Sequence, residues 1–226
     1  EFEGSTEVTE AGSTDTFTVV LDAQPTSDVV ITVTPNDTSE ISTSGTLTFT
    51  PINWDTPQTV TVTGVDEDIV DGTITSSITL AVVDATSNDN FDAVADQTVS
   101  VDTTDDDVAG FTIDELDGSI EVDESGTTDT FTVVLDAQPT SDVIVTVNLS
   151  DAGEASGNSS LTFTSANWDT PQTDTVPGVD DSIIDGTIPS TITVAVDDAN
   201  SDNDVDAVAD QTVSVDTTDD DVAGFT

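Results

Sequence analysis

The sequence predicts an all-β protein: two tandem, antiparallel immunoglobulin-like sandwiches of about seven strands each. Short runs of Val, Ile, Leu and Phe alternate with Thr, as in Thr16–Leu21. A period of two residues is typical of strands with one buried face. No stretch of the sequence shows a helical period. Finally, long segments recur at a fixed offset that matches the length of a whole domain.

The recurrence needs no insertion or deletion. Thr16–Val29 returns as Thr130–Val143, Asn53–Thr59 as Asn167–Thr173, and Asp102–Asp107 as Asp216–Asp221, each 114 residues later. We therefore expect one domain at 1–107, with its opening strand truncated, and a second domain at 108–221. We interpret residues 222–226, which repeat Val108–Thr112, as the start of a further repeat.

Within the first copy the strands follow from the alternation. They are expected near Val8 and then around Phe17–Leu21, Val29–Val33, Leu47–Phe49, Val60–Val62, Ile78–Val82 and Val99–Val101. The outward positions are mostly Thr, a β-branched residue that keeps strand propensity while it faces water. In the second copy, Val108–Ile113 adds an opening strand that the first copy lacks.

The composition excludes several classes of function. The 226 residues include 48 acidic residues and no Lys, Arg or His, which gives a formal charge of -48. Such a chain repels nucleic acid and anionic membranes, and no apolar run is long enough for membrane insertion. Without His, Cys, Lys, Arg and Tyr, only carboxylates and hydroxyls remain for catalysis, so we do not expect an enzyme.

The recurring Asp105–Asp107 and Asp219–Asp221 clusters indicate a cation. Three adjacent carboxylates repel one another, and this chain has no positive side chain to place among them. A hard divalent ion held by oxygen ligands is the first candidate. The alternative is an acidic surface with no specific ion. Because the acids gather in loops that a sandwich brings to one end, whereas Thr covers the strands, a specific site is favoured.

Several motifs occur in the same order in both copies. Val8-Thr9-Glu10-Ala11-Gly12 and its counterpart Val122–Gly126 are followed by Leu-Thr-Phe, by the acidic loop Asp66–Asp71 or Asp180–Asp185, and by the terminal Asp-Asp-Asp. This pattern resembles the Calx-β domain, especially the tandem form of large bacterial surface adhesins and calcium-dependent secreted repeat proteins. The resemblance covers nearly all of both copies and implies a sandwich that binds Ca²⁺ at one tip, beside the linker.

The resemblance also implies a set of calcium ligands in each copy. In the first copy they are Glu10, Asp37, Asp66, Glu67, Asp71, Asp105, Asp106 and Asp107, with the backbone carbonyl of Ile69. In the second copy they are Glu124, Asp151, Asp180, Asp181, Asp185, Asp219, Asp220 and Asp221, with the carbonyl of Ile183. Asp71 and Asp185 stand where the family usually has a glutamate.

The expected function is that of a calcium-rigidified spacer repeat in a long extracellular adhesin or secreted repeat protein. Its partners would be neighbouring repeats, reached through calcium-bridged linkers, and its location the cell surface or the medium. The alternative is a calcium-dependent module that binds polysaccharide or a cell surface. Such a ligand could also be bound by another part of the protein to which these repeats belong. The close similarity of the two copies favours the spacer.

Three further features of the sequence lead to predictions: an acidic loop, the two tryptophans and one aspartate in a strand. The Asp84–Asp96 loop is either a further cation site or a turn rich in Asx residues. Trp54 and Trp168 either stack on sugars or, as we favour, close the edge of the core. Asp174 replaces Val60 at a strand position that should face the core, which predicts a less stable second domain.

Overall fold

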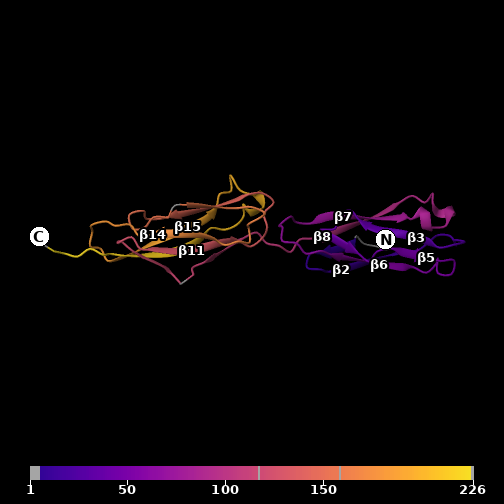
Figure 1. Cartoon of the computed structure of the whole chain (residues 1–226), viewed down its shortest axis with the longest axis horizontal. Coiled ribbons are helices and arrows are strands. Elements are labelled where there is room, and N and C mark those ends of the chain that lie inside the picture. The colour runs from indigo at the N-terminus through magenta and orange to yellow at the C-terminus, as the bar shows by residue number, and fades with distance from the viewer. Residues whose placement is uncertain (1–5, 117, 158, 225–226) are drawn as a thin grey trace. The chain divides into compact units, whose positions relative to one another are not determined.

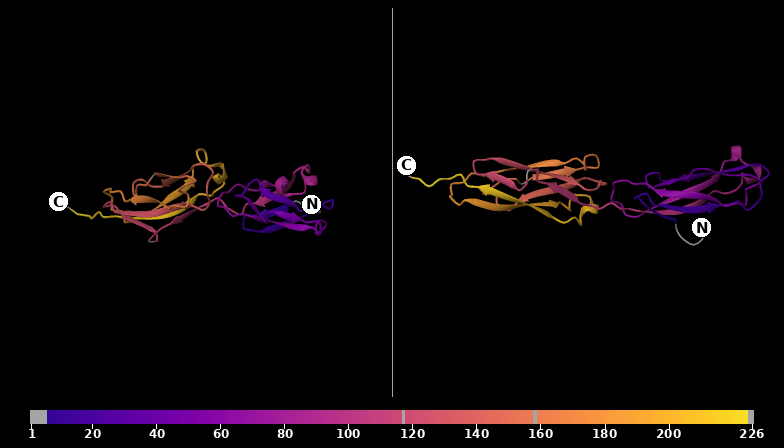
Figure 2. Two further views of the ribbon diagram at one scale, coloured as in Figure 1. Left: turned by 45° about the vertical axis from the view of Figure 1, so that its right-hand side comes forward. Right: turned by 90° about the horizontal axis from the view of Figure 1, so that it is seen from below.

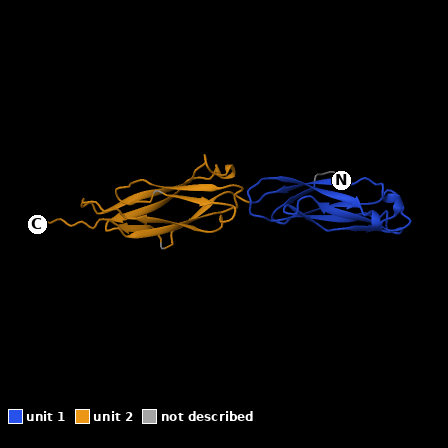
Figure 3. Ribbon diagram, turned by 45° about the horizontal axis from the view of Figure 1, so that its top comes forward, with its two compact units in different colours: residues 1–106 blue, residues 107–226 orange. Residues whose placement is uncertain are grey.

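The computed structural model describes residues 6–116, 118–157 and 159–224. The chain divides into two compact units, Glu1–Asp106 and Asp107–Thr226, coloured separately in Figure 3. Strands make up both units, and their loops gather at the ends of each unit (Figure 2). The predicted all-β fold with two tandem immunoglobulin-like sandwiches is confirmed. No helix in the described part of the chain is long and apolar enough to span a membrane.

Unit 1 contains two sheets (Figure 1). Its strands are β1 (Thr6–Thr9), β2 (Thr14–Val19), β3 (Val29–Pro35), β4 (Ile41–Thr43), β5 (Leu47–Phe49), β6 (Gln58–Gly64), β7 (Ile74–Val82) and β8 (Gln97–Thr104). The larger sheet has the order β1-β8-β7-β3-β5, and the smaller has the order β2-β6-β4.

Unit 2 repeats this plan with one exchange in the smaller sheet. Its strands are β9 (Phe111–Asp114), β10 (Ile120–Asp123), β11 (Thr128–Leu135), β12 (Val143–Leu149), β13 (Ser159–Phe163), β14 (Gln172–Pro177), β15 (Thr187–Val196) and β16 (Gln211–Thr218). The sheets have the orders β10-β16-β15-β12-β13 and β14-β11-β9. Strand β9 therefore lies beside β11, while the counterpart of β4 is reduced to a bridge between Ala155 and Gly178.

Alternating side chains fill the core of each unit. Inward-facing Val, Ile, Leu and Phe are buried, including Phe49 and Phe163 with no exposed surface, and Thr occupies many outward positions. This is the alternation that a half-buried strand requires. Trp168 packs against the core cluster of unit 2, in line with the reading favoured for it, whereas Trp54 is half-buried and is not among the residues packed against the core cluster of unit 1.

One strand pair in each unit is parallel, within an otherwise antiparallel fold. Strand β1 pairs with β8, and β10 pairs with β16, in parallel register. The first strand of the larger sheet and its last strand thus end at the same edge. The acidic residues that follow them, Glu10 and Asp105 in unit 1, consequently come out side by side.

Candidate metal centre

The parallel pair brings two distant carboxylates together in unit 1. Thr9 at the end of β1 lies opposite Thr104 at the end of β8. The backbone amide of Glu10 then donates to the carbonyl of Thr104 at 3.1 Å, which continues the ladder by one residue. Glu10 and Asp105 leave their strands at the same level, although nearly the whole unit separates them in sequence.

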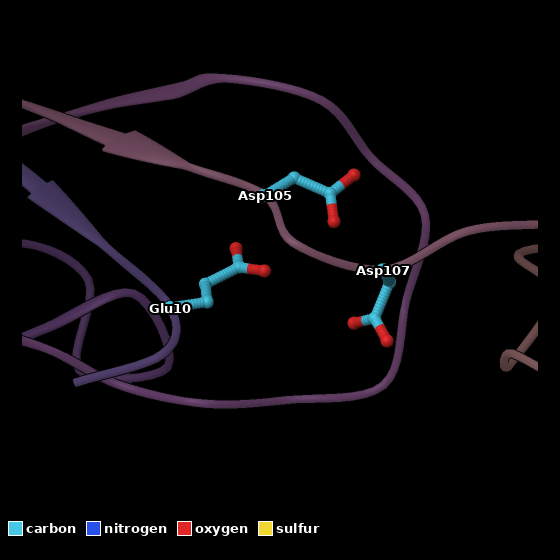
Figure 4. Close-up of side chains that lie close together, drawn as sticks. All are labelled: Glu10, Asp105 and Asp107. Carbon is cyan, nitrogen blue, oxygen red and sulfur yellow. The ribbon is translucent and has the colours of Figure 1, made fainter.

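The terminal aspartates do not all face the same way. Asp105 and Asp107 are half-buried, whereas Asp106 between them is exposed. An extended chain alternates its side chains, so the first and third acids of the cluster share one side. One carboxylate oxygen each from Glu10, Asp105 and Asp107 lies within 4.8 Å of the others, and the three groups point into one space (Figure 4).

A second group in unit 1 shares Glu10. Carboxylate oxygens of Glu10, Glu67 and Asp71 also lie within 4.8 Å of one another. Glu67 and Asp71 belong to the loop between β6 and β7, which approaches β1 because Gly64 ends β6. A Cβ atom at Gly64 would collide with the backbone carbonyl of Thr9, so only glycine permits this approach.

Unit 2 builds the corresponding arrangement. Glu124, Asp219 and Asp221 form one group of carboxylates within 4.8 Å, and Glu124, Glu154 and Asp181 form another. The amide of Glu124 donates to the carbonyl of Thr218 at 3.1 Å, as in unit 1. Asp219 and Asp221 are half-buried and Asp220 is exposed, so the alternation recurs.

Hydrogen bonds tie the β6–β7 loop to the end of β8. The Oδ2 atom of Asp105 accepts from the amides of Asp71 at 3.0 Å and Gly72 at 2.8 Å. Gly72 has a φ of 76°, a conformation that favours glycine. In unit 2, Oδ2 of Asp219 accepts from the corresponding amides of Asp185 at 3.0 Å and Gly186 at 3.1 Å.

These amides contribute to fixing the ionised form of Asp219. Its Oδ1 atom also accepts from the amide of Asp221 at 2.7 Å, and the three backbone hydrogen bonds lower the pKa of the carboxyl group. The loop and the aspartate cluster are therefore held together by a carboxylate that stays charged. The same carboxylate contributes a negative charge to the group around Glu124.

The buried glutamates titrate differently. Burial, with smaller contributions from Asp105, Asp71, Glu40 and Glu67, raises the pKa of Glu10 to about 7. Burial, followed by the charges of Asp181, Asp219, Asp185 and Glu154, raises the pKa of Glu124 to about 7 as well. Both effects disfavour the charged form when no cation is nearby.

The chemistry of this donor set fits a hard cation. Both carboxylate oxygens of Glu10, and Oε2 of Glu124, are shielded from solvent and accept no hydrogen bond from any described residue. Oδ2 of Asp221 is likewise shielded from solvent and accepts no hydrogen bond from any described residue. A buried acceptor without a donor is costly. A calcium ion takes six to eight oxygen ligands, mostly carboxylates and carbonyls, and would satisfy these atoms.

The predicted ligands fall into two sets. Of the predicted ligands, the four groups of carboxylates contain Glu10, Glu67, Asp71 and Asp105 of unit 1 with Asp107 directly after that unit, and Glu124, Asp181, Asp219 and Asp221 of unit 2. Among the described residues, the groups do not include Asp37, Asp66, Asp106, Asp151, Asp180, Asp185 or Asp220.

The second set has local explanations in the structure. Asp66, Asp106, Asp180 and Asp220 are exposed, as are Asp151 and Asp185, although exposure alone does not decide membership, because Asp71 is exposed and belongs to a group. Oδ1 of Asp37 accepts from the amide of Ser39 at 3.0 Å and from its hydroxyl, which lowers the pKa of Asp37. Oδ1 of Asp151 accepts from the amide of Gly153 at 2.9 Å. Asp37 and Asp151 thus stabilise their own loops.

The carbonyls of Ile69 and Ile183 remain predicted ligands. The residues lie in the same loops as Glu67 and Asp181, and the amide of Ile183 donates to Oδ1 of Asp181 at 2.6 Å. This bond orients the carboxylate of Asp181, which is a member of a cluster.

Sequence reasoning missed Glu40 and Glu154. Both are buried, and Glu154 belongs to a group with Glu124 and Asp181. Burial raises the pKa of each, assisted by the neighbouring acids. Their carbonyls accept from the amides of Val65 and Val179 at 2.9 Å, which joins the β3–β4 loop of unit 1, and its counterpart in unit 2, to the acidic loop. The signal available in the sequence was the recurrence of Glu40 as Glu154 at the offset of 114 residues.

The Asp84–Asp96 loop is built as an Asx-rich turn. The buried Asn88 accepts from the amide of Asn90 at 3.1 Å and donates to Oγ1 of Thr26 at 2.7 Å. Its counterpart Asp202 accepts from Oγ1 of Thr140 at 2.7 Å and from the amide of Ser141 at 2.6 Å. None of the carboxylate groups found in the described chain draws on this loop.

No family model matches the chain, and no curated protein sequence matches it. Among solved structures, the calcium binding domain CBD12 of CALX1.1 is similar with 16% identity and a TM-score of 0.34, over 85% of this chain and 77% of that one. CBD12 of CALX1.2 is similar with 13% identity and a TM-score of 0.33, over 95% and 98%. Domains 4 and 5 of the S-layer protein SbsC follow with 14% identity and a TM-score of 0.37, over 83% and 70%. These similarities are remote, and the function proposed below rests on the acidic side chains themselves.

Proposed function

We propose that each unit binds Ca²⁺ at the end where Glu10, or its counterpart Glu124, meets the terminal aspartates. One observation carries the proposal. Shielded carboxylate oxygens converge in a chain that has no Lys, Arg or His to neutralise them. In unit 1 the ion would be held by Glu10, Glu67, Asp71, Asp105 and Asp107, and in unit 2 by Glu124, Glu154, Asp181, Asp219 and Asp221.

The bound ion would supply positive charge and a fixed coordination shell. Asp105 directly follows the last residue of β8, and Asp107 is two residues further along the segment that leaves the sandwich. An ion that holds both of them, together with Glu10 directly after β1, would fix the direction in which the chain leaves the sandwich. We therefore propose that the repeat is a calcium-rigidified spacer.

The setting of such a spacer is part of the proposal. Calcium at millimolar concentration is available outside cells, where weak sites of extracellular modules are filled. We accordingly place the repeat in a long extracellular adhesin or secreted repeat protein, with neighbouring repeats as its partners through calcium-bridged linkers. The identical sequences of Thr16–Val29 and Thr130–Val143 support a repeated structural element over a module specialised for binding polysaccharide.

The proposal is tested by calorimetric calcium titration of four proteins. The unmodified chain should bind calcium at both units. Glu10→Gln should remove or strongly weaken the binding at unit 1, because Glu10 is common to both carboxylate groups there. Glu124→Gln should do the same at unit 2.

Asp106→Asn is the matched control. It removes one negative charge from the same cluster, but its side chain is exposed between Asp105 and Asp107. Specific binding predicts that Asp106→Asn keeps nearly the full affinity while Glu10→Gln does not. If both variants lose affinity equally, the ion is only attracted by the acidic surface, and the proposed site is wrong.

A further inference from the structure

Strand β9 completes the smaller sheet of unit 2. Phe111, Thr112, Ile113 and Asp114 lie opposite Leu135, Val134, Val133 and Thr132 of β11 in antiparallel register. Phe111 is only 3% exposed, and Ile113 packs against the same core. The side-chain amide of Gln211 donates to the carbonyl of Phe111 at 2.5 Å, and the amide of Asp136 donates to the carbonyl of Gly110 at 3.0 Å.

The described part of unit 1 contains the counterpart of β11, but no strand of the β9 type pairs with it there. Its smaller sheet has the order β2-β6-β4, so β2, the counterpart of β11, is an edge strand among the described residues. β2 also ends at Val19, whereas β11 extends to Leu135, the counterpart of Leu21.

The side chains of β2 and of the two residues after it are less buried than their counterparts in unit 2. Phe131, Val133 and Leu135 are buried in unit 2, while their counterparts Phe17, Val19 and Leu21 are only partly buried. Together with Phe91, Val94 and Leu80, these three line a cavity of about 360 Å³. Gln97, the counterpart of Gln211, lines it too.

We propose that this cavity and the free edge of β2 form an acceptor site for an extended peptide strand of the β9 type. The occupant has the sequence Ala-Gly-Phe-Thr-Ile-Asp and comes from another repeat, where it follows the aspartate cluster. It lies antiparallel to β2, with Phe opposite Leu21 and Ile opposite Val19. Edge strands beside an apolar groove bind peptides in this way, by adding a strand to the sheet.

Two features of the chain identify this occupant. In unit 2, β9 pairs with β11, and the segment that contains most of β11, Thr130–Val143, is identical in sequence to Thr16–Val29 of unit 1. The segment Val108–Thr112 also recurs in the sequence as residues 222–226, so the donor sequence is repeated along with the acceptor. None of the acidic groups at the other site lines the cavity, so this proposal does not depend on calcium binding.

The test is a titration of the isotope-labelled chain with a capped peptide of sequence Val-Ala-Gly-Phe-Thr-Ile-Asp-Glu, followed by amide NMR. Calcium is present throughout, and moderate salt screens the repulsion between the acidic peptide and the acidic chain. We expect saturable shifts and slower hydrogen exchange at residues 18–21. A peptide carrying Phe111→Ser and Ile113→Ser has the same charge and should bind more than about tenfold more weakly.

A protein variant tests the register without disturbing the core. Gln97→Ala should weaken peptide binding by about fivefold, because it removes the counterpart of the bond from Gln211 to the Phe111 carbonyl. Thr98→Ala, at the next and exposed position, should leave binding unchanged. The proposal is overturned if the first peptide causes no shifts at residues 18–21, or if the serine-substituted peptide shifts them equally.

Discussion

Glu10 and Glu124 should give the calcium-free chain an unusual pH dependence. Their pKa is about 7 in the folded state, above the ordinary value of 4.5. The folded state therefore binds extra protons between these values, and the stability that they contribute is lost as pH rises through about 7. Calcium-free protein should accordingly melt at a higher temperature at pH 5.5 than at pH 8.

Calcium should reverse this trend. Protons and calcium compete for the same carboxylates, so the increase in melting temperature caused by calcium should be large at pH 8 and small at pH 5.5. Thermal unfolding at both pH values, with and without calcium, gives the four melting temperatures that are compared. A calcium effect that does not change between pH 8 and 5.5 would contradict the assignment of the buried glutamates as ligands.

Asp174 is a second residue with a measurable consequence. It faces the core as the sequence predicts, with 6% exposure, and burial raises the pKa of its carboxyl group. Oδ1 accepts from the hydroxyl of Ser159 at 2.7 Å, while Oδ2 is shielded and accepts no hydrogen bond from any described residue. Val60 occupies the counterpart position in unit 1, so a valine fits this place in the fold.

We therefore expect Asp174→Val to stabilise unit 2 by about 1–3 kcal/mol, since it removes a buried acceptor that lacks a donor. Denaturant unfolding of the whole chain measures the gain, with the transition of unit 1 as an internal reference. Thr173→Val at the exposed neighbouring position is the control, and it should change stability little. If Asp174→Val lowers the stability of unit 2, the prediction is wrong, because the carboxylate would then stabilise the fold.

The inward orientation of Asp174 could be predicted from the sequence, because it depends only on the alternation of inward and outward side chains along one strand. The same rule separates Asp105 and Asp107 from Asp106, although the whole cluster was predicted to ligate. Glu40 and Glu154 could not be found in this way. Their burial depends on where a loop packs against another loop, and strand periodicity does not determine that contact.

At the scale of elements, two glycines allow the acidic ends to form. A Cβ atom at Gly178 would collide with the backbone carbonyl of Asp123, just as one at Gly64 would collide with that of Thr9. We expect Gly178→Ala to destabilise unit 2 by roughly 1–3 kcal/mol, the usual cost of overpacking, and to weaken calcium binding there because Glu124 follows Asp123.

Gly157→Ala provides the matched control in the same unit. A Cβ atom at Gly157 would approach other atoms no closer than 3.8 Å, which is ordinary van der Waals contact. Chemical unfolding and calcium titration of both variants compare the two positions. Equal behaviour of Gly178→Ala and Gly157→Ala would refute the requirement for close approach.

The strands themselves were largely predictable, because Thr and aliphatic residues alternate along each of them. The pairing of β1 with β8 was not, since periodicity is the same in parallel and antiparallel neighbours. Nor does periodicity decide which strand occupies an edge. Strand β9 of unit 2 lies in the predicted opening strand Val108–Ile113, but the reduction of the counterpart of β4 to a bridge between Ala155 and Gly178 was not predictable.

For the whole molecule, the charge of -48 sets the behaviour without calcium. The carboxylates at the end of each unit then repel one another. Monovalent salt screens this repulsion but cannot coordinate Glu10, Asp105 and Asp107 together. Calcium should therefore stiffen the chain in a way that salt does not imitate.

Small-angle X-ray scattering of the 226-residue chain tests this claim most directly. The samples are chain with calcium, chain with chelator at matched ionic strength, and the Glu10→Gln variant with calcium. We predict a longer maximum dimension and less flexibility with calcium than with chelator, and intermediate behaviour for the variant. The same dimension and the same flexibility in calcium and in chelator would contradict the account, because the aspartate clusters would then be only solvated ends.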